Sequence, residues 1–183
     1  MNAIIDTSSL LAFVRYYLPF DKSGTFKQLL QTKFDNGEII ILDKVFEESK
    51  FISQGIILKE LAFLHDKKKH INISSLIPSK KFFNLLENQF CNKDIVRLKG
   101  ITEVEFEQEK LRYLTTPDAN LLLYALSIKA NSPIVVTEET KTANDNKIFK
   151  KIPQNCKEID IACCSLPKLL KDYFKIDISK LTM

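Results

Sequence analysis

Four carboxylates stand at the ends of predicted strands or in the first turns of predicted helices. Asp6 ends the first predicted strand and Glu139 lies just past the third, whereas Glu48 and Asp118 lie early in predicted helices. The carboxyl ends of parallel strands share one edge of a sheet, so these four acids are expected to converge on one cleft. Converging carboxylates repel one another unless protons or cations are present, and hard oxygen ligands favour Mg²⁺ or Mn²⁺. A metal held in this way supports hydrolysis of phosphodiesters.

Each of these acids also has an ordinary structural explanation. Asp6 at a strand–helix junction is a good helix N-cap, and Asp118 in a first turn complements the helix dipole. Glu48 and Glu139 each follow another glutamate, so each is also compatible with a solvated charge. The hypothesis of a shared site therefore depends on the combination of the four positions.

Alternating strand and helix patterns surround these acids and predict an α/β sandwich with a mostly parallel sheet. The predicted strands are residues 2–5, 38–42, 133–139 and 157–166. The predicted helices are residues 8–18, 25–37, 43–52, 115–132 and 167–174, with three more helical patterns at 55–70, 79–90 and 103–114. Asp43 and Thr116 are the expected caps of two of these helices. We expect one domain over residues 1–183, with an extra helical segment at about 54–110.

Composition narrows the classes of function. The 183 residues carry a net charge of +4, which suits a polyanionic partner such as nucleic acid. With only four glycines, the chain has neither a phosphate-binding loop nor a dinucleotide fingerprint. No signal peptide or membrane-spanning run is recognisable, and the cysteines lack the spacing of a disulfide framework. These features predict a cytoplasmic protein with reduced thiols and no membrane partner.

At these positions the sequence resembles the PIN-domain ribonucleases, a family that includes the toxins of bacterial VapBC toxin–antitoxin pairs. "IIDTSSLL" resembles the family's first motif, an acid after strand one followed by small polar residues. "LDKVFEES" resembles the second motif, with Glu48 as its acid, and "TPDANLLLYAL" the third, in which Asp118 heads a helix. "IVVTEE" resembles the fourth, which places Thr137 and Glu139. The combination of "RYYLPFD", "VVTEE" and "KIPQNC" is similar to one bacterial PIN subfamily, and the resemblance covers about 1–50 and 112–173.

The resemblance implies a three-layer α/β/α sandwich and a divalent-metal-dependent endoribonuclease, the toxin of a toxin–antitoxin pair. The site residues that it implies are Asp6, Ser8, Glu48, Asp118, Thr137 and Glu139. The four acids would bind Mg²⁺ or Mn²⁺, and the two hydroxyls would hold a bound water or an inner carboxylate. The resemblance further implies products with 5′-phosphate and 3′-hydroxyl ends, an antitoxin partner and a homodimer.

Several positions depart from the family pattern. Ser8 stands where many members have Asn, and Glu139 replaces the more common Asp. Asp145 is a further acid that could join the site or take the place of Glu139, and only the alignment favours Glu48 over Glu47. The alternative function is a catalytically silent PIN fold that binds RNA or serves as a scaffold. A phosphotransferase of the haloacid dehalogenase kind is disfavoured, because it needs a second Asp where Ser8 stands.

Basic residues of the middle segment are a candidate guide for an RNA backbone. They are the run "HDKKKH" at 65–70 together with Lys80 and Lys81, although a short charge run is more often a solvated loop. His65 and His70 are five residues apart, and no C-x-x-C accompanies them, so structural zinc is not expected. Cys163 and Cys164 are expected to be core residues.

Overall fold

Four short parallel strands form the sheet at the centre of the molecule. In the computed structural model, which describes residues 2–141 and 146–176, the strands are β1 (Ala3–Ile5), β2 (Ile39–Ile40), β3 (Ile134–Val136) and β4 (Ala162–Cys164). Their order across the sheet is β2-β1-β3-β4, and every pairing is parallel. β1 and β3 are buried along their whole length, as expected for apolar, β-branched strands covered on both faces. The predicted α/β fold with a mostly parallel sheet is confirmed.

Helices connect and cover these strands. They are α1 (Thr7–Tyr16), α2 (Thr25–Asp35), α3 (Asp43–Ser49), α4 (Ile56–Glu60), α5 (Lys80–Leu85), α6 (Lys93–Leu98), α7 (Glu103–Leu114), α8 (Pro117–Ser127), α9 (Ile152–Glu158) and α10 (Leu166–Lys168). The shorter helical turns are η1 (Leu18–Phe20), η2 (Ile52–Gly55), η3 (Ala62–His65), η4 (Lys67–Lys69), η5 (Leu86–Phe90), η6 (Lys129–Asn131) and η7 (Leu169–Tyr173). None of the described helices is long and apolar enough to cross a membrane.

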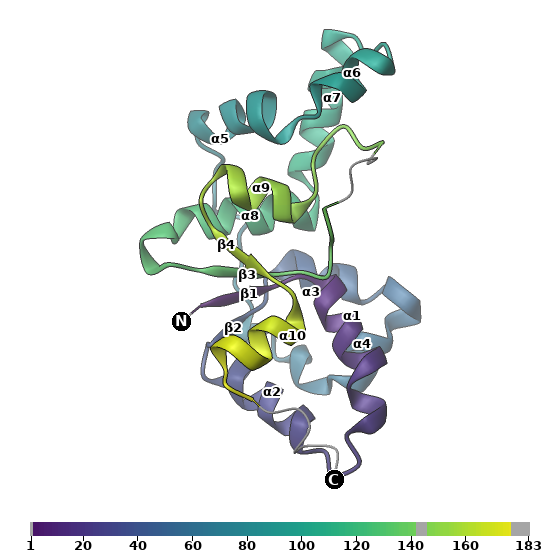
Figure 1. The fold of residues 1–183 in the computed structure, drawn as a ribbon, viewed down its shortest axis with the longest axis vertical. Coiled ribbons are helices and arrows are strands. Elements are labelled where there is room, and N and C mark those ends of the chain that lie inside the picture. Colours follow the sequence, from purple (N-terminus) through teal and green to yellow (C-terminus); the bar gives the residue numbers. More distant parts are fainter. Residues whose placement is uncertain (1, 142–145, 177–183) are drawn as a thin grey trace.

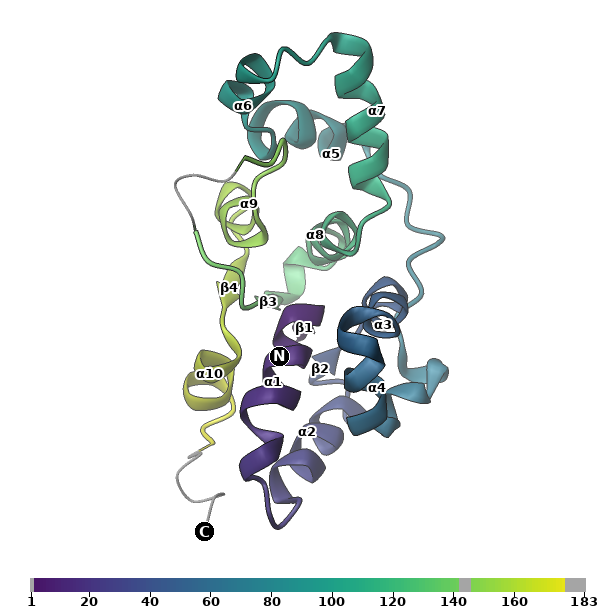
Figure 2. The same cartoon turned by 90° about the vertical axis from the view of Figure 1, so that its right-hand side faces the viewer.

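The helices lie in two layers, one on each side of the sheet (Figure 1). α8 and α9 lie on one side, and α1, α2 and α10 lie on the other. α5, α6 and α7 extend this arrangement beyond α8 and α9, at the end of the molecule that lies at the top of Figure 2. The layers match the expected α/β/α sandwich, and most of the extra helical segment forms a cap at one end.

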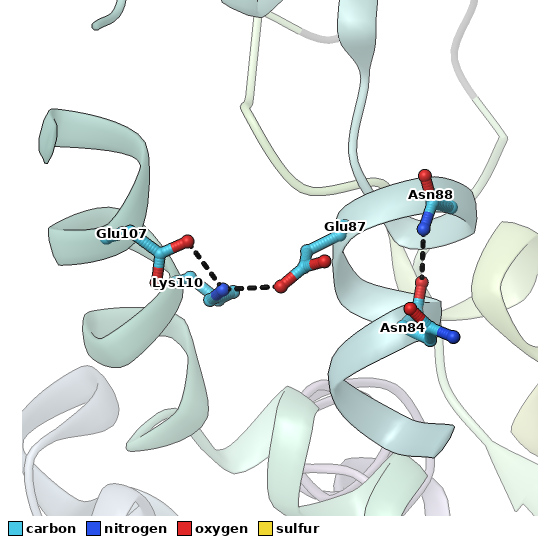
Figure 3. A network of polar contacts seen from close by, with 5 residues as sticks. All are labelled: Asn84, Glu87, Asn88, Glu107 and Lys110. Carbon is cyan, nitrogen blue, oxygen red and sulfur yellow. Dashed lines mark hydrogen bonds and ion pairs between the residues drawn. The ribbon is translucent and has the colours of Figure 1, made fainter. Parts of the chain in front are cut away.

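A lysine that is almost fully covered anchors α7 to the rest of this cap. Lys110 is 5 % exposed. Its Nζ donates to Glu107 on the same helix at 2.7 Å and to Glu87 of η5 at 2.6 Å. Figure 3 shows the ammonium group between the two carboxylates, which come from the two facing segments. α7 in turn leads through Thr115 and Thr116 into α8, so this contact helps to position the start of α8.

The helix starts that matter for the site follow capping rules. Asp6 is the N-cap of α1, and its Oδ1 accepts from the Thr7 amide at 2.7 Å. Thr116 caps α8 as predicted, with Pro117 in the first turn. The expectation for Asp43 was wrong: the N-cap of α3 is Leu42, and Asp43 is the first residue of the helix.

The segment between β3 and β4 contains a helix that was not predicted, and β4 is shorter than predicted. α9 fills "IPQNCKE", where no helix was predicted, and β4 begins only at Ala162 rather than at 157. The N-cap residue of α9, Lys151, makes no side-chain capping bond, so the local sequence lacks the usual start signal. A crossover helix between β3 and β4 is nevertheless what a parallel pair of strands requires.

The middle segment is less regular than its apolar periodicity predicted. Residues 55–70 form α4 followed by η3 and η4 instead of one helix, because the backbone leaves the helical region at Leu61 and at Asp66. The chain reverses before α4 through Ser53, Gln54 and Gly55, which all have positive φ (49°, 59° and 72°). α6 is a further helix that the sequence pattern did not predict.

One buried hydrophobic cluster joins the sheet to this middle segment. It contains strand residues such as Ile4 and Val135 together with Phe82 and Phe90 of the cap. All four cysteines are free, and three of them are buried. Cys164 is core as expected, whereas Cys163 is partly exposed. The prediction of a single domain over 1–183 agrees with this shared core and stays a prediction.

Candidate active site

The candidate site lies where the strand order reverses. β1 has β2 on one side and β3 on the other, and the connecting helices lie on opposite faces of the sheet. In open α/β sheets such a switch point leaves a crevice at the carboxyl ends of the strands, where ligands bind. β1 ends at Ile5 and β3 at Val136, so Asp6 and Thr137 are the first residues past this edge.

Asp6 is held in one orientation by three hydrogen bonds. Its side chain is buried, at 5 % exposure. Besides the Thr7 amide, Ser8 Oγ donates to Asp6 Oδ2 at 2.6 Å and Thr137 Oγ1 donates to the same oxygen at 2.9 Å. Asp6 is thus both the helix cap and the convergence point of two hydroxyls, so the structural and functional explanations of this residue are compatible.

Thr137 and Ser8 connect β3 to the start of α1. Their hydroxyl oxygens are 3.2 Å apart. Thr137 Oγ1 also accepts from the Glu139 amide at 3.2 Å, and Ser8 Oγ accepts from the Glu138 amide at 3.0 Å. The two hydroxyls that were expected to orient a carboxylate therefore do contact Asp6, and they also fix the chain after β3.

The two adjacent glutamates of α3 have different surroundings. The Glu48 carboxylate accepts a hydrogen bond from Thr7 Oγ1, which places it beside the start of α1. Glu47 is exposed and pairs with Lys50 at 2.6 Å. Glu48 therefore points toward the crevice and Glu47 points away from it. Thr7 was not identified from the sequence, where it is the first of three hydroxyl residues after Asp6.

The glutamates after β3 each secure a helix start. Glu139 Oε2 accepts from the Ile152 amide at 2.9 Å, at the beginning of α9. Glu138 Oε1 accepts from the Leu166 amide at 2.7 Å, at the beginning of α10, and from Ser9 Oγ at 3.4 Å. The sequence did not reveal these capping roles, because α9 was not predicted and both partners are distant along the chain.

Asp118, in the first turn of α8, has the least favourable surroundings of the four acids. Burial and the negative charges of Asp6, Glu139 and Glu48 raise its pKa to about 7. No hydrogen bond to its carboxylate is found among the described residues, and the charge of Lys147 acts in the opposite direction on its pKa. A carboxylate that is crowded by other carboxylates and lacks donors is stabilised by a bound proton or cation.

A buried tyrosine and asparagine form the wall next to Asp118. Burial and the charges of Asp118 and Glu139 raise the pKa of Tyr113 far above its ordinary value, so the phenol stays protonated. Asn155 Nδ2 donates to Tyr113 Oη at 3.3 Å and to the Lys150 carbonyl at 2.8 Å. Asn155 Oδ1 is buried without a partner among the described residues. Neither residue was a sequence candidate, since both resemble ordinary core positions.

Asp6, Glu48 and Glu139 act electrostatically on Asp118. Within the described ranges, no three His, Cys, Asp or Glu side chains lie close enough together to hold a metal ion. The donor chemistry nevertheless fits a hard divalent cation, because every candidate ligand is a carboxylate oxygen. Asp145, the alternative fourth acid, lies outside the described residues.

The basic residues proposed from the sequence lie elsewhere. Lys81 lines the same cavity as Leu126, near the C-terminal end of α8, whereas Asp118 is at the N-terminal end of that helix. In the 65–70 run, Lys69 pairs with Asp35, and His70 packs on the Phe46 ring with 4.5 Å between ring centres. His70 Nε2 also hydrogen-bonds the Leu64 carbonyl at 2.7 Å. The structure gives these residues no contact with the four acids.

Comparison with known proteins identifies a family. Residues 4–174 match the family described as Domain of unknown function (DUF4411). The chain belongs to this family. No curated protein and no solved structure matches the chain. The DUF4411 match runs from within β1 to the end of the helical turn after α10. It therefore includes all four acids of the candidate site and the α5–α7 cap.

Proposed function

We propose that this DUF4411 chain is a divalent-metal-dependent endoribonuclease that hydrolyses phosphodiester bonds of RNA. The observation that carries the proposal is the convergence on Asp118 of charges from Asp6, Glu48 and Glu139, which come from three other segments of the chain. Folding does not require this concentration of negative charge at the edge of the sheet. The repulsion between the carboxylates destabilises the folded protein when no metal is bound. The resemblance to the PIN-domain ribonucleases supports the same function.

The four acids would hold one or two Mg²⁺ or Mn²⁺ ions. Bound there, the metal would supply an activated water and neutralise charge on the phosphoryl oxygens. Asp6 is already oriented by Ser8 and Thr137, so little ordering remains to be done when a cation binds. Glu48 is oriented in the same way by Thr7. Glu139 keeps Oε1 available while its Oε2 caps α9.

The direct test is a nuclease assay on labelled RNA with Mn²⁺ or Mg²⁺, with EDTA as the metal-free arm. We expect the wild type to cut RNA and Asp6→Asn and Asp118→Asn to be inactive, since a neutral amide is a poor ligand for a hard cation. Glu47→Gln is the matched control, because Glu47 neighbours Glu48 but is exposed and paired with Lys50. Metal-dependent cleavage that survives Asp6→Asn would refute the assignment of the site.

Thr137 is proposed as a positioning residue for this reaction. Thr137→Val keeps the shape of the side chain but removes the hydrogen bond to Asp6 and the acceptor for the Glu139 amide. Loss of such an outer contact typically lowers activity or metal affinity about 10- to 100-fold. We expect a higher Mn²⁺ concentration at half-maximal rate for Thr137→Val, and near wild-type behaviour for Thr137→Ser. Equal metal dependence in all three proteins would contradict the role.

A catalytically silent RNA-binding or scaffold module is the second candidate. The observation in its favour is that the acids are not close enough together to share a metal ion in the described residues. RNA binding without cleavage under any divalent metal would support this candidate over the nuclease.

A role as a toxin, with an antitoxin partner and a homodimeric state, rests on the family resemblance alone. A small DNA-binding protein encoded in the neighbouring reading frame would support the toxin proposal. The test is to express this chain alone and together with that neighbouring protein. Growth arrest by the chain alone, relieved by co-expression of the neighbour, would support the toxin role.

A further inference from the structure

A basic cavity of about 380 Å³ lies directly beside Asp118. Its lining includes one acid of the candidate site, a second acid and an excess of lysines: Asp118, Glu109, Lys99, Lys147, Lys150 and Lys151. Glu109 is already paired with Arg112 at 2.8 Å. The positive charge of the cavity therefore exceeds its negative charge, although the crevice next to it is strongly acidic.

Three parts of the chain build the walls of this cavity. Lys99 ends α6, Tyr113 belongs to α7, and Lys147 and Lys150 come from the chain between β3 and α9. Tyr113 and Phe149 stack at 4.2 Å between ring centres and form an aromatic side of the cavity. Lys99 and Glu109 belong to the segment at about 54–110, in which the sequence singled out only the basic residues at 65–70, 80 and 81.

Backbone and side-chain contacts hold the walls together. The Asn92 amide donates to the Ile148 carbonyl at 2.7 Å, and the Lys150 amide donates to the Phe90 carbonyl at 2.8 Å. Cys91 and Phe149 form an antiparallel bridge between these two bonds. Lys99 Nζ donates to the Asn146 carbonyl at 2.6 Å, which closes the cavity from the α6 side.

The lysines on the β3–α9 side are placed to meet an anion. Lys147 is exposed, and its charge reaches Asp118. Lys150 is partly covered, and its contact with Glu158 is loose, at 3.2 Å between Nζ and Oε1. Such pairs contribute little to stability, so retention of these charges around a concave surface needs another explanation.

We propose that this cavity binds a phosphate of the RNA strand next to the phosphodiester that is cut. The inference rests on the proposed nuclease function and extends it to the α6–α7 segment, which thereby becomes one wall of the substrate site. Lysine ammonium groups bind backbone phosphates without reading sequence. The neighbouring phosphate would offset the repulsion between the RNA strand and the four acids, and it would position the strand at the crevice.

The test measures binding of a fluorescently labelled single-stranded RNA by anisotropy in EDTA, where no cleavage occurs. The variant is Lys147→Ala/Lys150→Ala, and the matched control is Lys168→Ala/Lys171→Ala, which removes the same charge at the same spacing from the exposed surface of α10 and η7, in the opposite helical layer. Thermal unfolding verifies that each variant is folded. We expect the cavity variant to bind about tenfold more weakly and its log–log salt slope to fall by about 0.7, since one phosphate contact with a single strand contributes ~0.7. The control should keep both values.

A single Lys99→Ala variant tests the wall from α6. It should weaken RNA binding in the same direction, while Lys99→Arg should retain it. Wild-type affinity in the Lys147→Ala/Lys150→Ala protein, or an equal loss in the control, would overturn the proposal. Cleavage with Mn²⁺ is measured in parallel. Cleavage with unchanged affinity in the cavity variant refutes the cavity alone, whereas lysine-dependent binding without any cleavage refutes the nuclease and supports the cavity.

Discussion

At the scale of single residues, the metal-free protein should be least stable when Asp118 is charged. Its pKa is raised from 3.8 to about 7, so between these values the folded state binds more protons at Asp118 than the unfolded state does. Stability therefore falls as the pH rises through this window, and the penalty is complete above pH 7. Asp118→Asn removes the charge, and it should raise the free energy of unfolding at pH 8 by roughly 2–4 kcal/mol, at ~1.4 kcal/mol per pKa unit.

Urea unfolding of both proteins in EDTA, at pH 4 and at pH 8, measures this effect. The two proteins should have similar stability at pH 4, where Asp118 is protonated, and diverge at pH 8. Glu47→Gln is the control, and it should not reproduce the divergence, because Glu47 lies outside the crevice. A constant difference between Asp118→Asn and the wild type at both pH values would show that burial and the neighbouring acids do not raise the pKa of Asp118.

Adjacent acids mark the limit of what the sequence predicts at this scale. The sequence located the four acids at element ends, but Glu47 and Glu48 are distinguished only by the direction in which each leaves α3. Glu138 binds the amide of Leu166, about 28 residues away, and Glu139 binds the amide of Ile152, about 13 residues away. Such partners depend on tertiary packing, which a local pattern does not contain. Tyr113 and Asn155 were missed for the same reason.

At the scale of elements, Lys110 should contribute to the stability of α7 against the cap. Burial alone would lower the pKa of Lys110, but the hydrogen bonds to Glu107 and Glu87 outweigh it and raise the pKa. Lys110→Met keeps most of the aliphatic stem and removes both bonds. We expect a loss of about 1.5–3 kcal/mol in the free energy of unfolding at pH 7, the usual range for hydrogen bonds to charged groups.

The matched control for Lys110 lies on the same helix. Arg112 pairs with Glu109 at the same spacing, but its side chain is 73 % exposed, so Arg112→Met should change stability by less than ~0.5 kcal/mol. Because the folded pKa of Lys110 lies above the ordinary lysine value of 10.5, its contribution is complete below pH 10.5 and is lost as the pH rises through the folded pKa. Denaturant titrations at pH 7 and above pH 11 measure this change. Equal losses in the two variants would contradict the anchoring role.

Elements with a strong local signal were predicted, and those defined by packing were not. α7 occupies residues 103–114 as predicted, with a capping box between Thr102 and Glu105, and α8 begins after its expected cap. α9 has no side-chain bond from its N-cap residue, and its first amide, that of Ile152, donates to Glu139 from another part of the chain. The start of a helix that depends on a partner distant in the sequence cannot be predicted from the spacing of apolar residues.

At the scale of the whole molecule, a divalent cation should stabilise the fold globally. The four acids come from the starts of α1 and α8, from α3 and from the end of β3, so their mutual repulsion opposes the packing of segments that are distant in sequence. A cation that binds only the folded state adds RT ln(1 + [L]/Kd), about 2.7 kcal/mol at one hundred times Kd. The midpoint of thermal unfolding of the wild type should therefore rise with Mg²⁺ or Mn²⁺ at pH 8.

This stabilisation should depend on the site and not on general screening of charge. Asp6→Asn and Asp118→Asn should lose most of the rise in midpoint, while Glu47→Gln should keep it, because its charge is outside the crevice. Potassium chloride at equal ionic strength separates binding from screening, since screening acts on all exposed charges alike. A rise of the same size in every variant would mean that the cation acts on the surface in general. A rise confined to proteins with all four acids would mean that one binding event, at the edge where β1 and β3 meet, holds these four segments together.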